Sequence, residues 1–132
     1  MILYTKPTVI ITYDDDKTLF YLKWIGFTPG KEFREIIDIT FEFMLKENIY
    51  RILSDIKEQK VVAPQEQDYF KDAALRFYRK TGKLKIAFIT DQKSLAFTCA
   101  QRYNRAVLSE IGLDINRFFD CEEDALSWLM EV

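Results

Sequence analysis

The sequence predicts a mixed α/β domain, and two observations lead to that prediction. Two runs rich in β-branched and aromatic residues, Thr8–Asp14 and Thr18–Phe27, flank only a short acidic turn and therefore predict an antiparallel hairpin. After them, apolar runs alternate with amphipathic stretches, which is typical of parallel strands joined by right-handed helical crossovers. The predicted order is β-β-α-β-α-β-α-β-α, with a mixed sheet.

The first half of the chain gives the hairpin, one helix and one strand. Whether Ile2–Tyr4 forms a short leading strand is left open, and Pro7 would end such a strand. Thr28 is expected to cap the first helix, with Pro29 at its first helical position. Residues at three- and four-residue spacing give this helix one apolar face: Phe33, Ile36, Ile37, Phe41, Met44 and Leu45. Tyr50–Ile56 is the next predicted strand.

The second half of the chain continues the alternation. Leu84–Thr90 is a nearly continuous apolar run, which is typical of a strand covered on both faces. Asp91 is expected to cap the helix after it, and Asp120 with Glu123 would form a capping box for the last helix. The remaining predicted elements are a helix from Pro64 to Lys80 ended by Gly82, a helix from about Lys93 to Ile111 ended by Gly112, and a short strand Asn116–Phe119.

Composition is that of a globular protein with one domain. The 132 residues are 48% hydrophobic and 30% charged, which suits a single domain over residues 1–132. The net charge of −2 does not favour nucleic-acid binding. No apolar run approaches the length of a membrane span, and the first residues lack the pattern of a signal peptide. We therefore expect a cytoplasmic protein.

The chain contains no histidine, and this absence limits the chemistry available to it. Ser-His-Asp and Cys-His catalysis and the usual zinc sites all require histidine. Ser54 lies beside Asp55 but has no base to activate it. We expect no enzyme activity, no catalytic residue and no cofactor.

Three stretches of the sequence resemble the STAS domains, the family of anti-sigma-factor antagonists with the SpoIIAA-like fold. They are "ITYDDDKTLFYLKWIGF" with "TPGKEFRE" after it, "RILSDIKEQKVVAPQEQDYF", and "INRFFDCEEDALSWL". With the order of elements, these stretches span nearly the whole chain. The likeness is greater to the bacterial branch usually labelled STAS/SEC14 or SpoIIAA-like. The resemblance implies the SpoIIAA-like fold and a regulatory or protein-binding role.

One departure from that family concerns its phosphorylation switch. In the antagonists, an aspartate ends a strand, and an Asp-Ser pair that opens the next helix follows about eight residues later. Placing Asp55 on that aspartate puts Ala63 and Pro64 where the Asp-Ser pair would stand. Proline suits a first helical turn but cannot accept a phosphate. We therefore expect the helix start to be kept and no phosphorylation site to be present.

The residues expected to bind a ligand or partner lie at the carboxyl ends of the strands, where open α/β sheets favour ligands. Asp55, Asp91 and Asp120 could together suggest a magnesium site, but helix capping is the preferred interpretation, so no metal is expected. The candidate binding residues are Trp24, Gly26, Ser54, Asp55, Lys57, Asp91 and Phe97.

The sequence favours a non-catalytic STAS-like module that binds an unidentified protein partner. A homodimer is also left open. The alternative is a carrier or sensor of a small apolar ligand such as a lipid. The aromatic content of 15% supports it, because aromatic side chains beyond those needed for the core can contact a ligand. A carrier requires a sizeable apolar cavity, whereas an interaction module shows a filled core and an exposed apolar patch.

Overall fold

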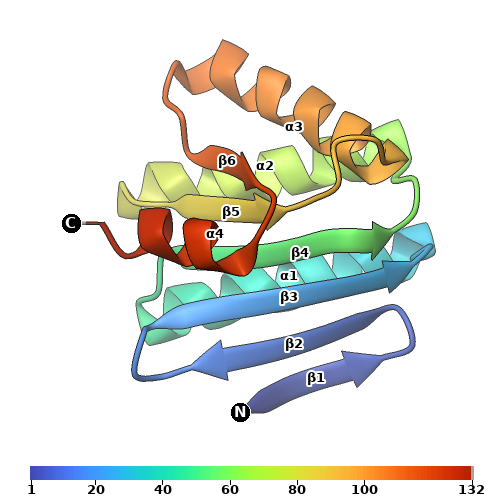
Figure 1. Cartoon of the computed structure of the whole chain (residues 1–132). Helices are drawn as coiled ribbons and strands as arrows, with labels where there is room; N and C mark the ends of the chain where they lie inside the picture. The colour runs from blue at the N-terminus through green and yellow to red at the C-terminus, as the bar shows by residue number, and fades with distance from the viewer. Residues whose placement is uncertain (132) are drawn as a thin grey trace.

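A six-stranded mixed sheet with helices on both faces forms the molecule (Figure 1). The computed structural model describes residues 1–131. The elements in chain order are β1 Ile2–Lys6, β2 Val9–Asp14, β3 Leu19–Gly26, α1 Gly30–Glu47, β4 Arg51–Gln59, α2 Pro64–Thr81, β5 Lys85–Ile89, α3 Leu95–Ile111, β6 Asn116–Phe119 and α4 Glu122–Leu129. The predicted fold class, the antiparallel hairpin and the parallel strands after it are confirmed.

The order of strands across the sheet is the same as their order along the chain. β1, β2 and β3 are antiparallel neighbours, whereas β3 to β6 are parallel. β1 is a full edge strand that extends to Lys6, so three strands rather than two precede the first helix. Because the parallel strands advance in one direction, right-handed crossovers place α1, α2 and α3 on one face, and α4 covers the other (Figure 1).

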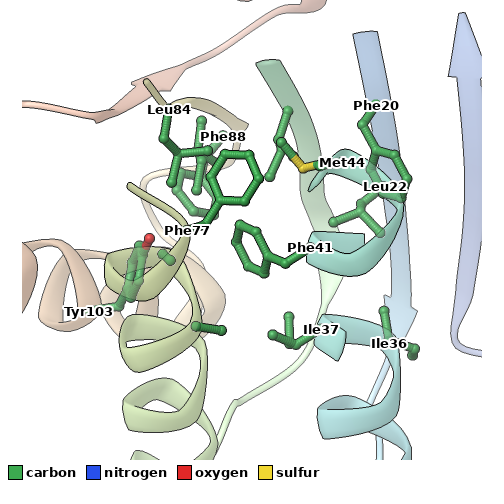
Figure 2. Packing of buried hydrophobic residues seen from close by; sticks show 14 of the residues in the cluster. Phe20, Leu22, Ile36, Ile37, Phe41, Met44, Phe77, Leu84, Phe88 and Tyr103 are labelled. Carbon is green, nitrogen blue, oxygen red and sulfur yellow. The ribbon is translucent and has the colours of Figure 1, made fainter. Parts of the chain in front are cut away.

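The sheet separates two apolar cores, because successive strand residues point to opposite faces. On the side of α1, α2 and α3, Phe20, Ile52 and Ile86 contribute to the larger core. Figure 2 shows Phe41 of α1 pointing toward Phe77 of α2, and their ring centroids are 5.5 Å apart. On the other side, the smaller core joins α4 to the strands and consists of Leu19, Leu53, Ala87, Ile89, Ala125, Trp128 and Leu129.

α1 and α4 each begin one residue later than the sequence predicts. α1 begins at Gly30, with Pro29 in the cap position, because the Phe33 amide donates the first helical hydrogen bond to the Pro29 carbonyl. Thr28 therefore caps nothing, and its buried hydroxyl has no hydrogen-bond partner among the described residues. α4 begins one residue later than the expected capping box, with Cys121 in the cap position and no side-chain cap.

The start of α3 also differs from the prediction. Ser94 caps this helix, since its Oγ accepts a hydrogen bond from the Phe97 amide at 3.1 Å. Asp91 instead accepts the Lys93 amide hydrogen bond at 3.0 Å within the loop after β5. By contrast, α2 begins at Pro64 and is followed by Gly82 in the left-handed conformation, as expected. Across residues 1–131, no helix combines the length and the apolar character that a membrane crossing requires.

Replacing the cap of α3 tests this reassignment. Ser94→Ala should lower the free energy of unfolding by about 1 kcal/mol, because an N-cap side chain satisfies an amide that the helix leaves unpaired. Asp91→Ala is the matched control and should cost less, since its loop is exposed. Urea unfolding followed by circular dichroism measures both values. A larger loss for Asp91→Ala would contradict the reassignment.

Candidate functional site

The parallel strands β3, β4 and β5 end at the same edge of the sheet, which we call the carboxyl edge (Figure 1). The Lys60 amide donates a hydrogen bond to the Gly26 carbonyl at 2.9 Å, which joins the ends of β3 and β4. The Cys99 thiol lies 3.5 Å from the Val62 carbonyl oxygen, which joins α3 to the segment between β4 and α2. The loops after these three strands are therefore held close to one another.

The structure brings two of the predicted site residues into direct contact. The Trp24 indole Nε1 donates a hydrogen bond to Ser54 Oγ at 3.1 Å, and both side chains are buried. The Trp24 ring also stacks on Phe33, with the centroids 5.3 Å apart. Since the hydroxyl of Ser54 is paired with an indole rather than a base, this pair positions the tryptophan and provides no activated nucleophile.

Trp24 and Ser54 form one wall of a small apolar pocket between the sheet and the starts of α2 and α3. Its volume of about 40 Å³ is far below that of ordinary ligand sites. The other lining residues are Phe33, Ile56, Gln59, Val62, Gln67, Phe70, Phe88, Ala96, Cys99, Ala100 and Tyr103. The core is thus nearly filled beneath the carboxyl edge.

Asp55 does not join Ser54, contrary to the prediction. β4 continues to Gln59, so Ser54 and Asp55 lie in its middle rather than at its end. Adjacent strand residues point to opposite faces, and Asp55 therefore lies on the side of α4. It is buried there, and its Oδ1 accepts the Lys57 amide at 3.1 Å.

The other predicted site residues lie at or near the carboxyl edge but do not converge. Gly26 ends β3 with a φ of 70°, a left-handed conformation that glycine adopts without strain. Lys57 and Asp91 are exposed. Phe97 packs edge-on against Phe118, with the centroids 5.4 Å apart. Among residues 1–131, no group of three or more acidic or cysteine side chains is placed to hold a metal ion.

Two buried polar residues of α2 contribute to this region and were not predicted. Gln67 Nε2 donates to the Val62 carbonyl at 2.7 Å, and its Oε1 accepts from Arg102 at 2.9 Å. Glu66 Oε1 accepts from Arg34 Nε at 3.0 Å and lies beside Gly30, where a Cβ would come within 2.9 Å of it. Gln67 lies three residues before Phe70 on the inward stripe of α2, a spacing that could have indicated its burial.

Comparison with solved structures identifies the fold. An uncharacterized DUF3478-family protein from Shewanella loihica PV-4, described as having a SpoIIAA-like fold, is similar over 96% of this chain and 98% of its own, with a TM-score of 0.57 and 17% sequence identity. The chain has a SpoIIAA-like fold. No protein-family model matches the sequence, and no curated protein matches it either.

The SpoIIAA-like fold confirms the resemblance to STAS domains at the level of structure. The loop between β4 and α2 is the segment that the sequence resemblance sets against the antagonists' phosphorylation switch. Its Ala63 and Pro64 open α2 at the expected place, and Pro64 is exposed.

The Trp24–Ser54 pair gives a prediction that a double-mutant cycle can test. Ser54→Ala should lower the free energy of unfolding by about 1–3 kcal/mol, because the buried indole N–H loses its acceptor. In a Trp24→Phe background the same change should cost distinctly less, since no N–H is left unpaired. Urea unfolding of the four proteins gives the coupling energy. Equal costs in both backgrounds would show that the hydrogen bond does not contribute.

Proposed function

We propose that the chain is a non-catalytic interaction module whose carboxyl edge binds an acidic, partly apolar surface of another protein. One observation carries this proposal: a large apolar side chain is exposed after β3, β4 and β5, three of the four parallel strands. Phe27 follows β3 and is 54% exposed, Val61 follows β4 and is 48% exposed, and Leu95 opens α3 after β5 and is 68% exposed. Apolar side chains gathered in one region of a surface are typical of a partner-binding site.

Charges at the same edge indicate the character of the partner. Lys57, Lys60 and Lys93 are all exposed there, and none of them forms an ion pair within residues 1–131. Unpaired ammonium groups around apolar side chains are complementary to a surface with carboxylates around an apolar centre. They also oppose a symmetric dimer through this edge, because the same lysines would face one another.

A non-catalytic role agrees with the positions of the polar residues. SpoIIAA-like proteins are typically not enzymes. Ser54 is bonded to Trp24, Asp55 lies on the opposite face of the sheet, and Asp91 is exposed in a loop. An active site would need such groups to converge around one reacting atom.

Exposed apolar residues at the two ends of the molecule provide a matched test. Val61→Ser with Leu95→Ser changes the carboxyl edge, whereas Leu45→Ser with Leu113→Ser changes exposed positions near the opposite ends of the strands. Each tagged protein is used to capture proteins from its host. A partner should be recovered by the wild type and the control, and lost with the edge variant.

The captured partner is then purified and its affinity is measured directly by calorimetry. We expect the edge variant to weaken binding by about tenfold or more, and binding to weaken as salt rises, because the lysines are exposed. Equal affinity for the edge and control variants would reject the edge as the binding surface.

The proline at the position set against the antagonists' phosphorylated serine gives a separate prediction. Pro64→Ser should leave the domain folded, since serine is tolerated in a first helical turn, but should create no substrate for an anti-sigma kinase. Incubation with such a kinase and labelled ATP, with the kinase's own antagonist as positive control, measures phosphate incorporation. Labelling of the variant at residue 64 would show that the switch needs only the hydroxyl.

The pocket beneath the edge supports a second candidate function, the binding of a small apolar ligand. Its walls are apolar, and it lies where α2 and α3 both begin. At about 40 Å³ it holds only a few atoms, so a lipid would require the two helices to move apart. Native mass spectrometry of protein purified gently from its host distinguishes the two functions, because a carrier would retain a small molecule.

A further inference from the structure

The face of the sheet on the side of α4 is only half covered. α4 packs over β4, β5 and β6, and no helix of the described chain lies over β1, β2 and β3 on this side (Figure 1). A trough of about 460 Å³ lies between α4 and the turn that joins β2 to β3. It is lined by Met1, Thr12, Tyr13, Asp14, Asp15, Asp16, Lys17, Leu19, Tyr21, Leu53, Glu122 and Leu126.

The rim of this trough carries an excess of negative charge. Asp14, Asp15 and Asp16 come from the turn, and Glu122 comes from the start of α4. The lining also holds two cations, Lys17 and the Met1 α-ammonium, which donates a hydrogen bond to the Tyr13 carbonyl at 3.2 Å. None of these carboxylates lies within 4.0 Å of a basic group in residues 1–131, although seven ion pairs form elsewhere. Four carboxylates and two cations leave the rim with a net negative charge.

Tyr21 lies in the lining of the trough, near two carboxylates. Burial, together with the nearby charges of Asp55 and Glu122, raises the pKa of Tyr21 to about 12. The rest of the floor is apolar and includes Leu19, Leu53 and Leu126. No group of three acidic side chains in the described chain is close enough to hold a metal ion, so the carboxylates surround the trough instead of converging on one point.

We infer that the trough binds a Lys- or Arg-rich segment of a partner protein that also carries apolar side chains. The charge complementarity points to this occupant: dispersed carboxylates suit several cations along a chain, and the apolar floor suits a Leu or Ile between them. This surface is distinct from the carboxyl edge, where the exposed lysines Lys57, Lys60 and Lys93 outnumber the exposed Asp91 and Asp120. Its partner is therefore of the opposite charge, and the inference does not depend on the proposed function.

A pair of charge-matched variants tests the inference. Asp16→Asn with Glu122→Gln removes two rim charges, and the glutamine keeps an oxygen that can accept from Tyr21. Glu35→Gln with Glu42→Gln removes two exposed charges from α1 on the other side of the sheet. The probe is a short fluorescein-labelled amphipathic peptide of Lys and Leu, with a Glu-and-Leu peptide as its control, and anisotropy is read at low and physiological salt.

We expect the Lys-Leu peptide to bind and the Glu-Leu peptide not to bind. The rim variant should weaken binding by about tenfold, whereas the α1 variant should change it less than about twofold. Amide shifts in a heteronuclear NMR titration should map to Thr12–Lys17, Tyr21 and Glu122. Circular dichroism confirms that both variants are folded.

Three results would overturn the inference. Absence of peptide binding, or equal weakening by both variants, would show that the trough does not select a basic segment. Peptide-induced shifts on other surfaces would do the same. Concentration-dependent self-association with shifts in the trough, observed without peptide, would assign it to a second copy of the chain.

Discussion

The parallel pairing of β3, β4 and β5 is the constraint on which both surfaces depend. β4 is hydrogen-bonded on both sides, with Ser54 opposite Leu22 in β3 and opposite Phe88 in β5. This register directs Ser54 toward Trp24 and Asp55 toward α4. Because side chains alternate along a strand, a slip of one residue would exchange the two faces. The slip would bury the Asp55 carboxylate in the larger core, and burying an unpaired charge is energetically costly.

Elements with strong apolar periodicity could be predicted from the sequence, as could the ends marked by Pro64, Gly82 and Gly112, whereas the end of β4 and the starts of α1, α3 and α4 could not. β4 continues past Lys57 to Glu58 and Gln59, which pair with β3 but carry no apolar alternation that would indicate a strand. That extension moved Asp55 from a predicted strand end to the middle of a strand. The cap of α3 posed a similar difficulty: Asp91 and Ser94 are both good caps, and only the path of the loop decides between them.

The buried polar contacts of α2 depend on tertiary structure that local sequence does not reveal. Glu66 meets Arg34 across 32 positions of the chain, and Gln67 meets Arg102 across 35. Each pair satisfies groups that would be costly to bury alone. Together they join the start of α2 to the start of α1 and to the middle of α3. The loop that follows β4 is held on this framework. Val61 is therefore exposed on a loop whose position these contacts hold.

The net charge of −2 conceals a separation of charge that becomes visible only in three dimensions. Unpaired lysines surround the carboxyl edge, whereas unpaired carboxylates surround the trough beside α4. Within residues 1–131, no ion pair joins the lysines of the edge to the carboxylates of the trough. The net charge does not show this separation, because it contains no information on where each charge lies. The domain therefore presents two surfaces of different charge, one at the carboxyl edge and one beside α4, and each suits a partner of the opposite charge.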